Sequence, residues 1–232
     1  MSAVPHKFAA VLPAGGLGKR MGGPLPKQLL SLRGKLVYRY SLETFLRLPE
    51  IAEVVLAVPA DWKSRFLEEL APGCGIPDGE LLKLRIVTGG ADRWQSVRNG
   101  VNALAHSDFV LIHDVARPFL SEALVREVFR TLELRGACLV AKPCADTVKV
   151  VENGTVRETL DRNRIWLAQT PQACRVDLLK SLYMEMDAHP LDFTPTDEAS
   201  ILEHFQIPVS IVRGSAENDK ITTPEDFDRF SK

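Results

Sequence analysis

A glycine-rich stretch near the N-terminus, with two separated cations, has the residue types needed to bind phosphate. The stretch VLPAGGLGKRMGGPLPKQLL (residues 11–30) passes from an apolar run through Pro13 into glycines, and it contains Arg20 and Lys27. Glycines let backbone N–H groups approach phosphate oxygens closely, and lysine and arginine can neutralise a triphosphate. Such a loop could stabilise a pentacoordinate phosphorus and a leaving pyrophosphate. Taken alone, the stretch also fits a charged surface loop.

The stretch matches neither of the two common phosphate-binding patterns. The P-loop pattern GxxxxGK[ST] fails because Arg20 stands where serine or threonine is required, and Pro13 where the first glycine is required. The dinucleotide pattern GxGxxG fails because Gly16 and Gly18 are followed by Met21. These departures favour a loop that handles a triphosphate during transfer.

The elements that must position this loop alternate between strands and helices. Short apolar runs indicate strands at residues 8–12, 53–59, 84–90 and 109–114. Helical spacing indicates helices at 36–48, 62–70, 94–104 and 121–136. We expect Asp61 and Ser121 to cap two of these helices. The alternation predicts an α/β fold, a mainly parallel sheet with helices on both faces, in which ligands bind beyond the carboxyl ends of the strands. The motifs PAGGLGKR, TGGADR and HDVARP, which each follow a strand, should therefore meet at one edge.

Residues 141–164 interrupt this alternation and predict a projecting β-arm. Two alternating runs in VKVVENGTVRETL flank Asn153-Gly154, which is a strong hairpin signal. An exposed hairpin leaves strand edges that need covering, so we expect the arm to pair with a second subunit. Beyond the arm, helices are expected at 176–186, 196–205 and 224–230, and short strands at 209–214 and 220–223.

Length and composition are those of an ordinary globular protein. The 232 residues are 45% hydrophobic and 25% charged, with a net charge of −1, which fits one domain over 1–232 and argues against a nucleic-acid partner. The four cysteines form no CxxC pair, so we expect free thiols in a reducing compartment. The first ten residues lack the apolar segment of a signal peptide, and no apolar run approaches the roughly 20 residues of a membrane span. We therefore expect a cytoplasmic protein without a membrane partner.

Several blocks along the chain resemble those of one enzyme family. The stretch PAGGLGKRMGGPLPKQ resembles the nucleotidyltransferase signature that opens sugar-nucleotide pyrophosphorylases. The blocks GGADRWQSV, HDVARPF, DTVK, LDRNRIW, QTPQ, TDEAS and NDKITTPED resemble, in this order, those of the 2-C-methyl-D-erythritol 4-phosphate cytidylyltransferase family. The resemblance covers about residues 8–230. Each block is a weak signal, but seven blocks in order are highly specific.

The resemblance implies a Rossmann-like nucleotidyltransferase fold and a reaction. The phosphate of methylerythritol 4-phosphate would attack the α-phosphorus of CTP in line, with Mg²⁺, and pyrophosphate would leave. This is a step of non-mevalonate isoprenoid biosynthesis. A phosphate monoester is largely ionised at neutral pH because its second pKa is about 6, so it needs little help from a general base. The site should therefore be rich in cations and hold a metal, and the family's homodimer with exchanged arms is implied as well.

The resemblance also assigns roles to individual residues. The catalytic residues would be Arg20, Lys27, Arg162 and Lys220. The residues that bind CTP would be Pro13, Ala14, Gly15, Gly16, Gly18, Gly90, Ser96 and Asp114. The residues that bind the acceptor would be Asp114, Arg117, Thr147, Arg162, Thr170, Thr196 and Lys220. Asp114 is expected to bind Mg²⁺, directly or through water. Arg93 is either structural or phosphate-facing, and His113 is expected to be a packed residue and not a base.

Two positions depart from the family pattern. Gly15 stands where the family often has alanine, which should leave the backbone contacts intact. The last block is typically Asp-Asn-apolar-Lys, but here it reads Glu217, Asn218, Asp219 and Lys220, with an unusual acid beside the lysine.

Two other functions are compatible with parts of this pattern. A ribitol-5-phosphate cytidylyltransferase shares the fold, the loop and the chemistry, although DRNRIW, TPQ and TDEAS favour the methylerythritol enzyme. A catalytically inactive nucleotide-binding module on the same fold is the other alternative, because a fold alone does not prove a function. The presence of every matched cation argues against such a module.

Overall fold

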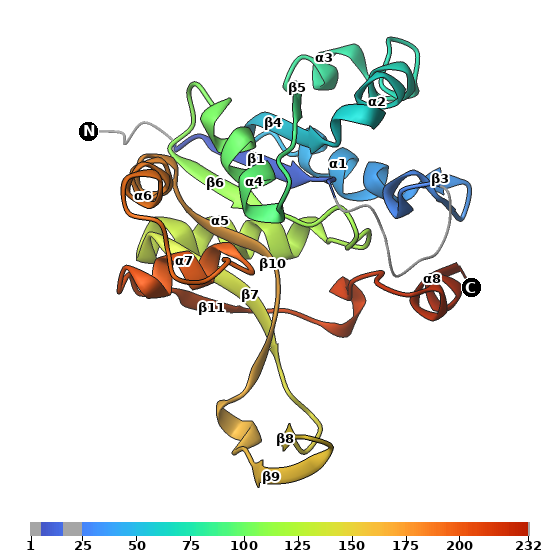
Figure 1. Cartoon of the computed structure of the whole chain (residues 1–232). Helices are drawn as coiled ribbons and strands as arrows, with labels where there is room; N and C mark the ends of the chain where they lie inside the picture. Colours follow the sequence, from blue (N-terminus) through green and yellow to red (C-terminus); the bar gives the residue numbers. More distant parts are fainter. Residues whose placement is uncertain (1–5, 16–24, 232) are drawn as a thin grey trace.

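The computed structural model of the chain describes residues 6–15 and 25–231. Its centre is a seven-stranded sheet with the strand order β11-β7-β10-β6-β1-β4-β5 (Figure 1). The strands are β1 (Phe8–Pro13), β4 (Ile51–Val58), β5 (Leu84–Thr88), β6 (Phe109–Ile112), β7 (Ala137–Pro143), β10 (Trp166–Arg175) and β11 (Ser210–Arg213). Two short pairs lie outside this sheet, β2 (Ser31–Leu32) with β3 (Lys35–Leu36), and β8 (Lys149–Glu152) with β9 (Thr155–Thr159).

The mainly parallel sheet is confirmed, with one exception that the sequence did not indicate. Strand β10 runs antiparallel to both of its neighbours, β6 and β7, whereas the other pairings are parallel. A proline inside an apolar run normally argues against a central strand because it cannot donate a ladder hydrogen bond. In β10 this proline is Pro171, and the pairing with β7 is interrupted between Ala168 and Gln172, so the strand accommodates it.

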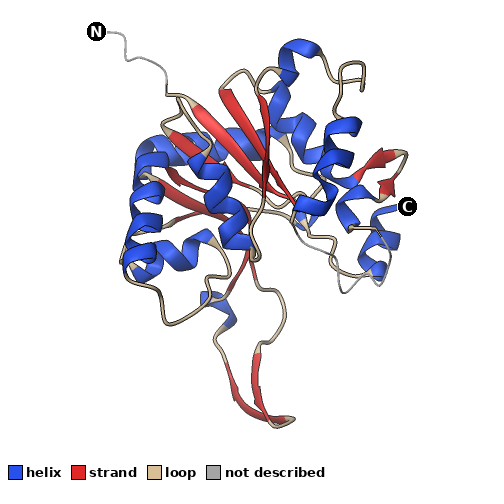
Figure 2. Cartoon of the chain, turned by 45° about the horizontal axis from the view of Figure 1, so that its top comes forward, coloured by secondary structure: helices blue, strands red, loops and turns tan. Residues whose placement is uncertain are grey.

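Helices cover both faces of the sheet (Figure 2). They are α1 (Val37–Arg47), α2 (Lys63–Glu69), α3 (Asp78–Leu81), α4 (Arg93–Asn102), α5 (Glu122–Arg135), α6 (Val176–Ala188), α7 (Glu198–His204) and α8 (Pro224–Ser231). Successive residues of β1 alternate between two apolar cores. Ala10 and Leu12 join the core that includes Phe45 of α1. Ala9 and Val11 join the core that includes Val97 of α4. A strand buried on both faces is expected to be continuously apolar, as β1 is.

The predicted helix ends are partly right. Helix α5 begins after Ser121, whose hydroxyl accepts from the backbone N–H of Leu124 at 3.2 Å, and ends at Gly136 with a left-handed φ of 78°. The cap predicted at Asp61 is wrong. Asp61 lies inside the 3₁₀ turn Ala60–Trp62, and α2 begins only at Lys63, without a side-chain cap.

The strand predicted at residues 220–223 is also wrong. This segment belongs to no strand, and two of its N–H groups are satisfied locally. The backbone N–H groups of Thr222 and Thr223 donate to one carboxylate oxygen of Asp226, at 2.9 and 3.1 Å, at the start of α8. The predicted strand at 209–214 is confirmed as β11.

The hairpin predicted around Asn153-Gly154 is confirmed. Asn153 and Gly154 both have positive φ angles, 50° and 75°, as a tight turn between β8 and β9 requires. Strands β7 and β10 carry the chain out of the sheet to this hairpin, which projects from the body (Figure 1). The 3₁₀ turn Arg162–Arg164 leads back from the hairpin to β10.

In the parts of the chain that the structure describes, no helix is both long and apolar enough to cross a membrane.

Candidate active site

A cavity of about 720 Å³ opens at the carboxyl ends of four parallel strands. Its wall contains residues that end or follow β1 (Pro13, Gly15) and residues that follow β4 (Pro59, Ala60, Asp61), β5 (Gly89, Gly90, Ala91, Asp92, Arg93) and β6 (Asp114, Val115, Ala116). Lys27 and Gln28 of the 3₁₀ turn Lys27–Leu29 and two residues before α8, Lys220 and Thr222, complete it. The prediction that the three strand-end motifs meet at one edge is therefore confirmed.

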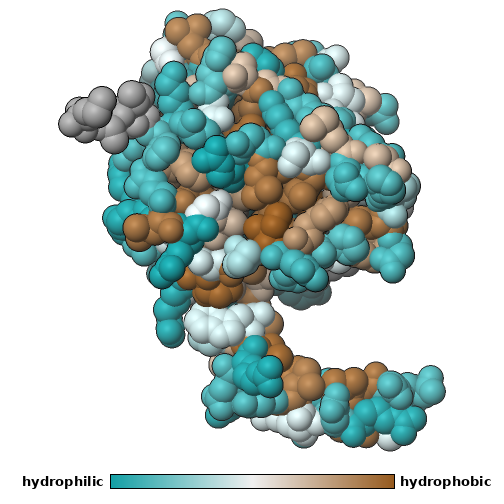
Figure 3. Space-filling view, turned by 90° about the vertical axis from the view of Figure 1, so that its left-hand side faces the viewer, coloured by the Kyte–Doolittle hydropathy of each residue, from teal (hydrophilic) through white to brown (hydrophobic). Residues whose placement is uncertain are grey.

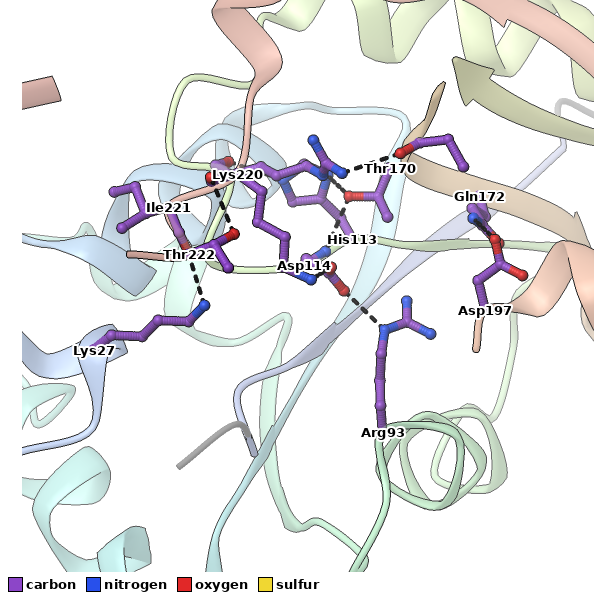
Figure 4. A network of polar contacts seen from close by, with 12 residues as sticks. Lys27, Arg93, His113, Asp114, Thr170, Gln172, Asp197, Lys220, Ile221 and Thr222 are labelled. Atoms are coloured by element: carbon purple, nitrogen blue, oxygen red, sulfur yellow. Dashed lines mark hydrogen bonds and ion pairs between the residues drawn. The ribbon is translucent and has the colours of Figure 1, made fainter. Parts of the chain in front are cut away.

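The carboxylate of Asp114 is the centre of the charged side chains in this cavity (Figure 4). One of its oxygens accepts from Arg93 Nε at 2.9 Å, and the other accepts from Lys220 Nζ at 2.6 Å. Although burial alone would raise the pKa of Asp114, the charges of Arg93 and Lys220 hold it well below its ordinary value. Asp114 is therefore a permanent anion that fixes two cations.

Arg93 is itself fixed from behind by Glu198. Its two terminal nitrogens donate to the two carboxylate oxygens of Glu198 at 2.8 and 3.0 Å. Glu198 is only 1% exposed, and burial raises its pKa although Arg93 opposes this. Burial also disfavours a charged Arg93, but the two carboxylates hold its pKa above the ordinary value. Arg93 therefore joins two acids. It contacts Glu198 through its terminal nitrogens, and it contacts Asp114, which lines the cavity, through Nε.

Sequence reasoning missed Glu198. It lies in the block TDEAS, directly after Asp197, whose side chain caps α7 by accepting from the N–H of Ser200. An acid in the first turn of a helix is ordinarily explained by the helix dipole, so nothing in the sequence alone marked it as a buried partner of Arg93.

His113 takes part in a chain of hydrogen bonds with a fixed direction. Its Nε2 lies 3.0 Å from the carbonyl oxygen of Arg117, so this nitrogen must carry the proton. Nδ1 must then accept from the hydroxyl of Thr170, also at 3.0 Å. The same hydroxyl accepts from the backbone N–H of Asp114 at 3.1 Å. Burial lowers the pKa of His113 to about 4, so the ring is neutral and serves as a packed, structural residue, as predicted.

Two glycines, Gly15 and Gly89, leave little space around Ser96, a residue that is 1% exposed. A Cβ added at Gly89 or Gly15 would lie 2.7 or 3.2 Å from the Ser96 hydroxyl, and one at Gly90 would collide with Gln95. The Ser96 hydroxyl accepts from the N–H of Gly90 at 3.0 Å and donates to the carbonyl of Asp92 at 3.2 Å. Gly15, Gly90 and Ser96, all predicted to bind CTP, are therefore brought together in the wall of the cavity.

The predicted phosphate-binding loop is only partly described. Gly16, Gly18 and Arg20 lie outside the described residues. Lys27 lines the cavity, and its Nζ donates to the carbonyl of Ile221 at 2.7 Å, one residue beyond Lys220 (Figure 4). Pro13 lines the same cavity, and Ala14 lies between Pro13 and Gly15, buried, with its N–H bonded to the carbonyl of Ala57.

Arg117 is not part of the cavity lining, although Ala116, the residue before it, is. Arg117 is 8% exposed, and it donates to the backbone carbonyls of Asn218 at 2.8 Å and Ala168 at 3.3 Å. Burial lowers its pKa. In this arrangement Arg117 joins the segment before Lys220 to β10, and its contact with an acceptor stays a prediction.

The remaining predicted acceptor residues do not line this cavity. Thr147 and Arg162 lie on the arm, where Arg162 donates to the carbonyl of Ala145 at 3.0 Å. Thr196 is exposed ahead of α7. Thr170 is buried, and the single proton of its hydroxyl is committed to His113.

The donor atoms near the cavity limit how a metal can be held. Within residues 6–15 and 25–231, no three or more His, Cys, Asp or Glu side chains are grouped to hold a metal ion. Both oxygens of Asp114 are already engaged by cations. Magnesium keeps several waters and is commonly bound by one or two carboxylates plus substrate phosphates. The residues present therefore fit a magnesium ion whose ligands come mainly from a nucleotide and water.

Comparisons with known proteins agree with this site. The model of the 2-C-methyl-D-erythritol 4-phosphate cytidylyltransferase family matches residues 8–230. The enzymes of that name from Geobacter metallireducens and Syntrophus aciditrophicus are both 40% identical to the chain; the matches cover 94% and 95% of it, and 93% of each relative. The crystal structure of 4-diphosphocytidyl-2C-methyl-D-erythritol synthase from Anaerococcus prevotii, 29% identical, superposes with a TM-score of 0.81 over 98% of both chains. By sequence and by fold, this chain is a nucleotidyltransferase that belongs to the 2-C-methyl-D-erythritol 4-phosphate cytidylyltransferase family.

Proposed function

We propose that this enzyme transfers the cytidylyl group of CTP to 2-C-methyl-D-erythritol 4-phosphate. An oxygen of the acceptor phosphate forms a bond to the α-phosphorus, the bond between that phosphorus and the bridging oxygen breaks, and pyrophosphate leaves. The observation that carries the proposal is Lys220, fixed by Asp114 at the cavity wall with a side chain that is 35% exposed. An ammonium group has three N–H donors, so two of them remain to hold an incoming phosphate.

The described lining residues support transfer without a covalent enzyme intermediate. Among these residues, Ser96 and Thr222 carry hydroxyls. The hydroxyl of Ser96 donates to the backbone carbonyl of Asp92, and the hydroxyl of Thr222 donates to the backbone carbonyl of Lys220. The nearby imidazole of His113 has both nitrogens in hydrogen bonds. None of these groups is arranged as a nucleophile with its base. An ionised phosphate monoester needs no such activation, whereas two anions that must meet need cations.

The triphosphate would lie between the glycine-rich loop and Lys220. Lys27 donates to the carbonyl of Ile221, the residue that follows Lys220, and both lysines line the cavity. We propose that Lys27 and Arg20 stabilise the charge on the leaving pyrophosphate. Asp114 would hold Mg²⁺ through water, and the ion would neutralise charge on the triphosphate when bound.

Ser96 offers a basis for selecting cytosine. Its proton is committed to Asp92, and one oxygen lone pair is used by Gly90. The hydroxyl can therefore only accept from a ligand, which suits an exocyclic amino group and disfavours a carbonyl at the same position. We infer that this favours cytosine over uracil. The backbone of Gly15 and Gly90, which lines the cavity beside Ser96, would limit the space for a purine.

The arm supports a homodimer. Val151 and Val156 of the hairpin are 55% and 57% exposed, and apolar patches along the arm are visible in Figure 3. We propose that these side chains are covered by a second copy of the chain, so that Thr147 and Arg162 of one subunit reach the cavity of its partner. The four cysteines are free, which fits a reducing compartment, and we place the enzyme in the cytoplasm.

A pyrophosphate-release assay tests the proposed reaction. The purified chain is given CTP and Mg²⁺ with either methylerythritol 4-phosphate or ribitol 5-phosphate, and UTP and ATP replace CTP in parallel reactions. Turnover is expected with CTP and methylerythritol 4-phosphate. Turnover confined to ribitol 5-phosphate would show that the alternative cytidylyltransferase is correct.

A further inference from the structure

The unusual acid beside Lys220 points away from the cavity. Asp219 accepts from Lys142 Nζ at 2.6 Å and from Gln169 Nε2 at 3.2 Å. Lys142 and Gln169 lie where the arm leaves the sheet, a region we call the arm stem (residues 141–143 of β7 and 166–169 of β10). The side chains of the neighbouring residues Asp219 and Lys220 thus point in different directions. Lys220 contacts Asp114 in the cavity, whereas Asp219 contacts the arm stem.

The segment before Lys220 is held against the arm stem by further contacts. Gln169 Nε2 also donates to the carbonyl of Ser215 at 2.8 Å, and Asn218 Nδ2 donates to the carbonyl of Thr170 at 2.8 Å. Gln169 is 2% exposed and packs so closely on the segment that a Cβ at Gly214 would collide with its amide. The segment and the arm stem therefore pack closely over several residues, and their contact is more than one surface ion pair.

Lys220 lies between two anchors. On one side Asp219 is tied to the arm stem, and on the other the N–H of Ile221 donates to the carbonyl of Ala116 at 2.8 Å, in the loop after β6. Residues 219–222 belong to no helix or strand. The position of the Lys220 backbone is consequently set by these contacts, and movement of either anchor would move the lysine.

We propose that Asp219 is a positioning residue and that the Lys142–Asp219 ion pair holds Lys220 in register with the arm stem. The two side chains are 26% and 22% exposed, so solvent screens this pair less than it screens a surface pair. The pair links the arm to Lys220, which is one of the two cations that Asp114 fixes. It makes the alignment of Lys220 depend on where the arm stem lies.

Steady-state kinetics of four variants test this proposal. Asp219→Asn and Lys142→Met are each expected to lower kcat/KM for methylerythritol 4-phosphate about tenfold, with KM for CTP and the melting temperature nearly unchanged. The double variant should also lose only about tenfold, because both changes break the same interaction. The exchanged pair, Lys142→Asp with Asp219→Lys, should recover part of the activity, because it restores an ion pair between the two positions.

A matched control is the ion pair between Lys35 and Glu43. Its N···O distance is also 2.6 Å, but these residues line a different cavity. Glu43→Gln should leave both KM values and kcat unchanged. The proposal is overturned if Asp219→Asn stays within about twofold of the parent, or if the double variant loses about 100-fold, as independent effects would.

The inference rests on the proposed role of Lys220, and the two can fail separately. Lys220→Met should lower kcat/KM for the acceptor far more than Asp219→Asn does. A severe loss for Lys220→Met, with no loss for Asp219→Asn, would overturn the positioning role alone. Full activity of Lys220→Met would overturn the role of the lysine and, with it, the inference.

Discussion

The cavity and the arm use the same kinds of charged side chain in opposite settings. In the cavity, Arg93 is paired with Glu198, which is 1% exposed, and with Asp114, whose side chain is 11% exposed. On the arm, Arg157 is paired with Glu152, and these two side chains are 58% and 61% exposed. The cations of the cavity are therefore fixed before any ligand arrives, whereas those of the arm are exposed to solvent.

This difference in burial shows which part of the site a single chain can complete by itself. All five residues of β9 are exposed, and an isolated two-stranded hairpin is only marginally stable in water. Contacts from outside the hairpin must therefore order the arm. The proposed roles of Thr147 and Arg162 depend on such contacts, whereas the geometry around Asp114 does not.

The largest difference between the cavity and the arm is expected in the free energy of unfolding. Arg93→Met should lower the free energy of unfolding by about 3–5 kcal/mol, because it leaves the buried carboxylate of Glu198 without its cation and removes one of the two cations that Asp114 contacts. Arg157→Met, the matched change on the arm, should alter it by less than about 0.5 kcal/mol. Urea unfolding of both variants measures this. Equal effects at the two positions would contradict the contrast between cavity and arm.

The next largest effect concerns catalysis by mixed dimers. Lys220→Met and Arg162→Met should each lower kcat/KM by about 100-fold or more, because each removes a cation proposed to contact the acceptor phosphate. If the arm acts on the partner, mixing the two variants regenerates one intact site in each heterodimer. Activity should then recover to about a quarter of the parental sites after subunit exchange.

The recovery of activity on mixing shows whether the arm completes the site of its partner or the site of its own chain. If the arm served its own chain, every site in the mixture would retain one defect and the activity would stay low. A mixture of Lys220→Met with Lys27→Ala is the control, since both positions line the cavity of one chain and no recovery is expected.

A third effect is the pH dependence of stability caused by His113. Its pKa is lowered to about 4 by burial, below its ordinary value of 6.5. The unfolded chain therefore binds a proton on this ring at pH 5 while the folded chain does not. The stabilisation is present above pH 6.5 and is lost as the pH falls to about 4, a change of about 3 kcal/mol. Unfolding measured across this range should show the slope, and His113→Gln should flatten it.

The smallest effect is expected for apolar residues of the arm. Val151→Asp with Val156→Asp should weaken the dimer about tenfold or more, because charges would replace apolar side chains at the proposed contact. The unfolding of the monomer should hardly change, because both side chains are exposed in one chain. Sedimentation equilibrium measures the association. Unchanged association would show that these valines are not at the subunit contact.

The elements closest to the cavity were predictable because their signals are local. Apolar runs followed by polar motifs identified β1, β4, β5 and β6, and the rule for parallel sheets then brought Gly15, Gly90, Asp114 and Lys27 to one edge. Asn153-Gly154 identified the hairpin, because both residues readily adopt positive φ.

The features that sequence reasoning missed depend on contacts between distant segments. Strand β10 is antiparallel and contains Pro171, a residue that is disfavoured in central strands, so no local signal predicted it. Glu198 and Arg93 are 105 residues apart, and only their contact shows that Glu198 is buried. Asp219 looked like a disturbance beside Lys220 until its partners, Lys142 and Gln169, placed it on the arm stem.

The pairing of Asp114 with two cations has a consequence for inhibitor chemistry. A drug amine aimed at this acid would compete with Arg93 and Lys220, which already neutralise its charge, so it would gain little. An anionic or strongly hydrogen-bond-accepting group would instead find the unused N–H donors of Lys220. The acid at the centre of the site is thus a poor target for cationic compounds, and bioisosteres of phosphate are the better starting point.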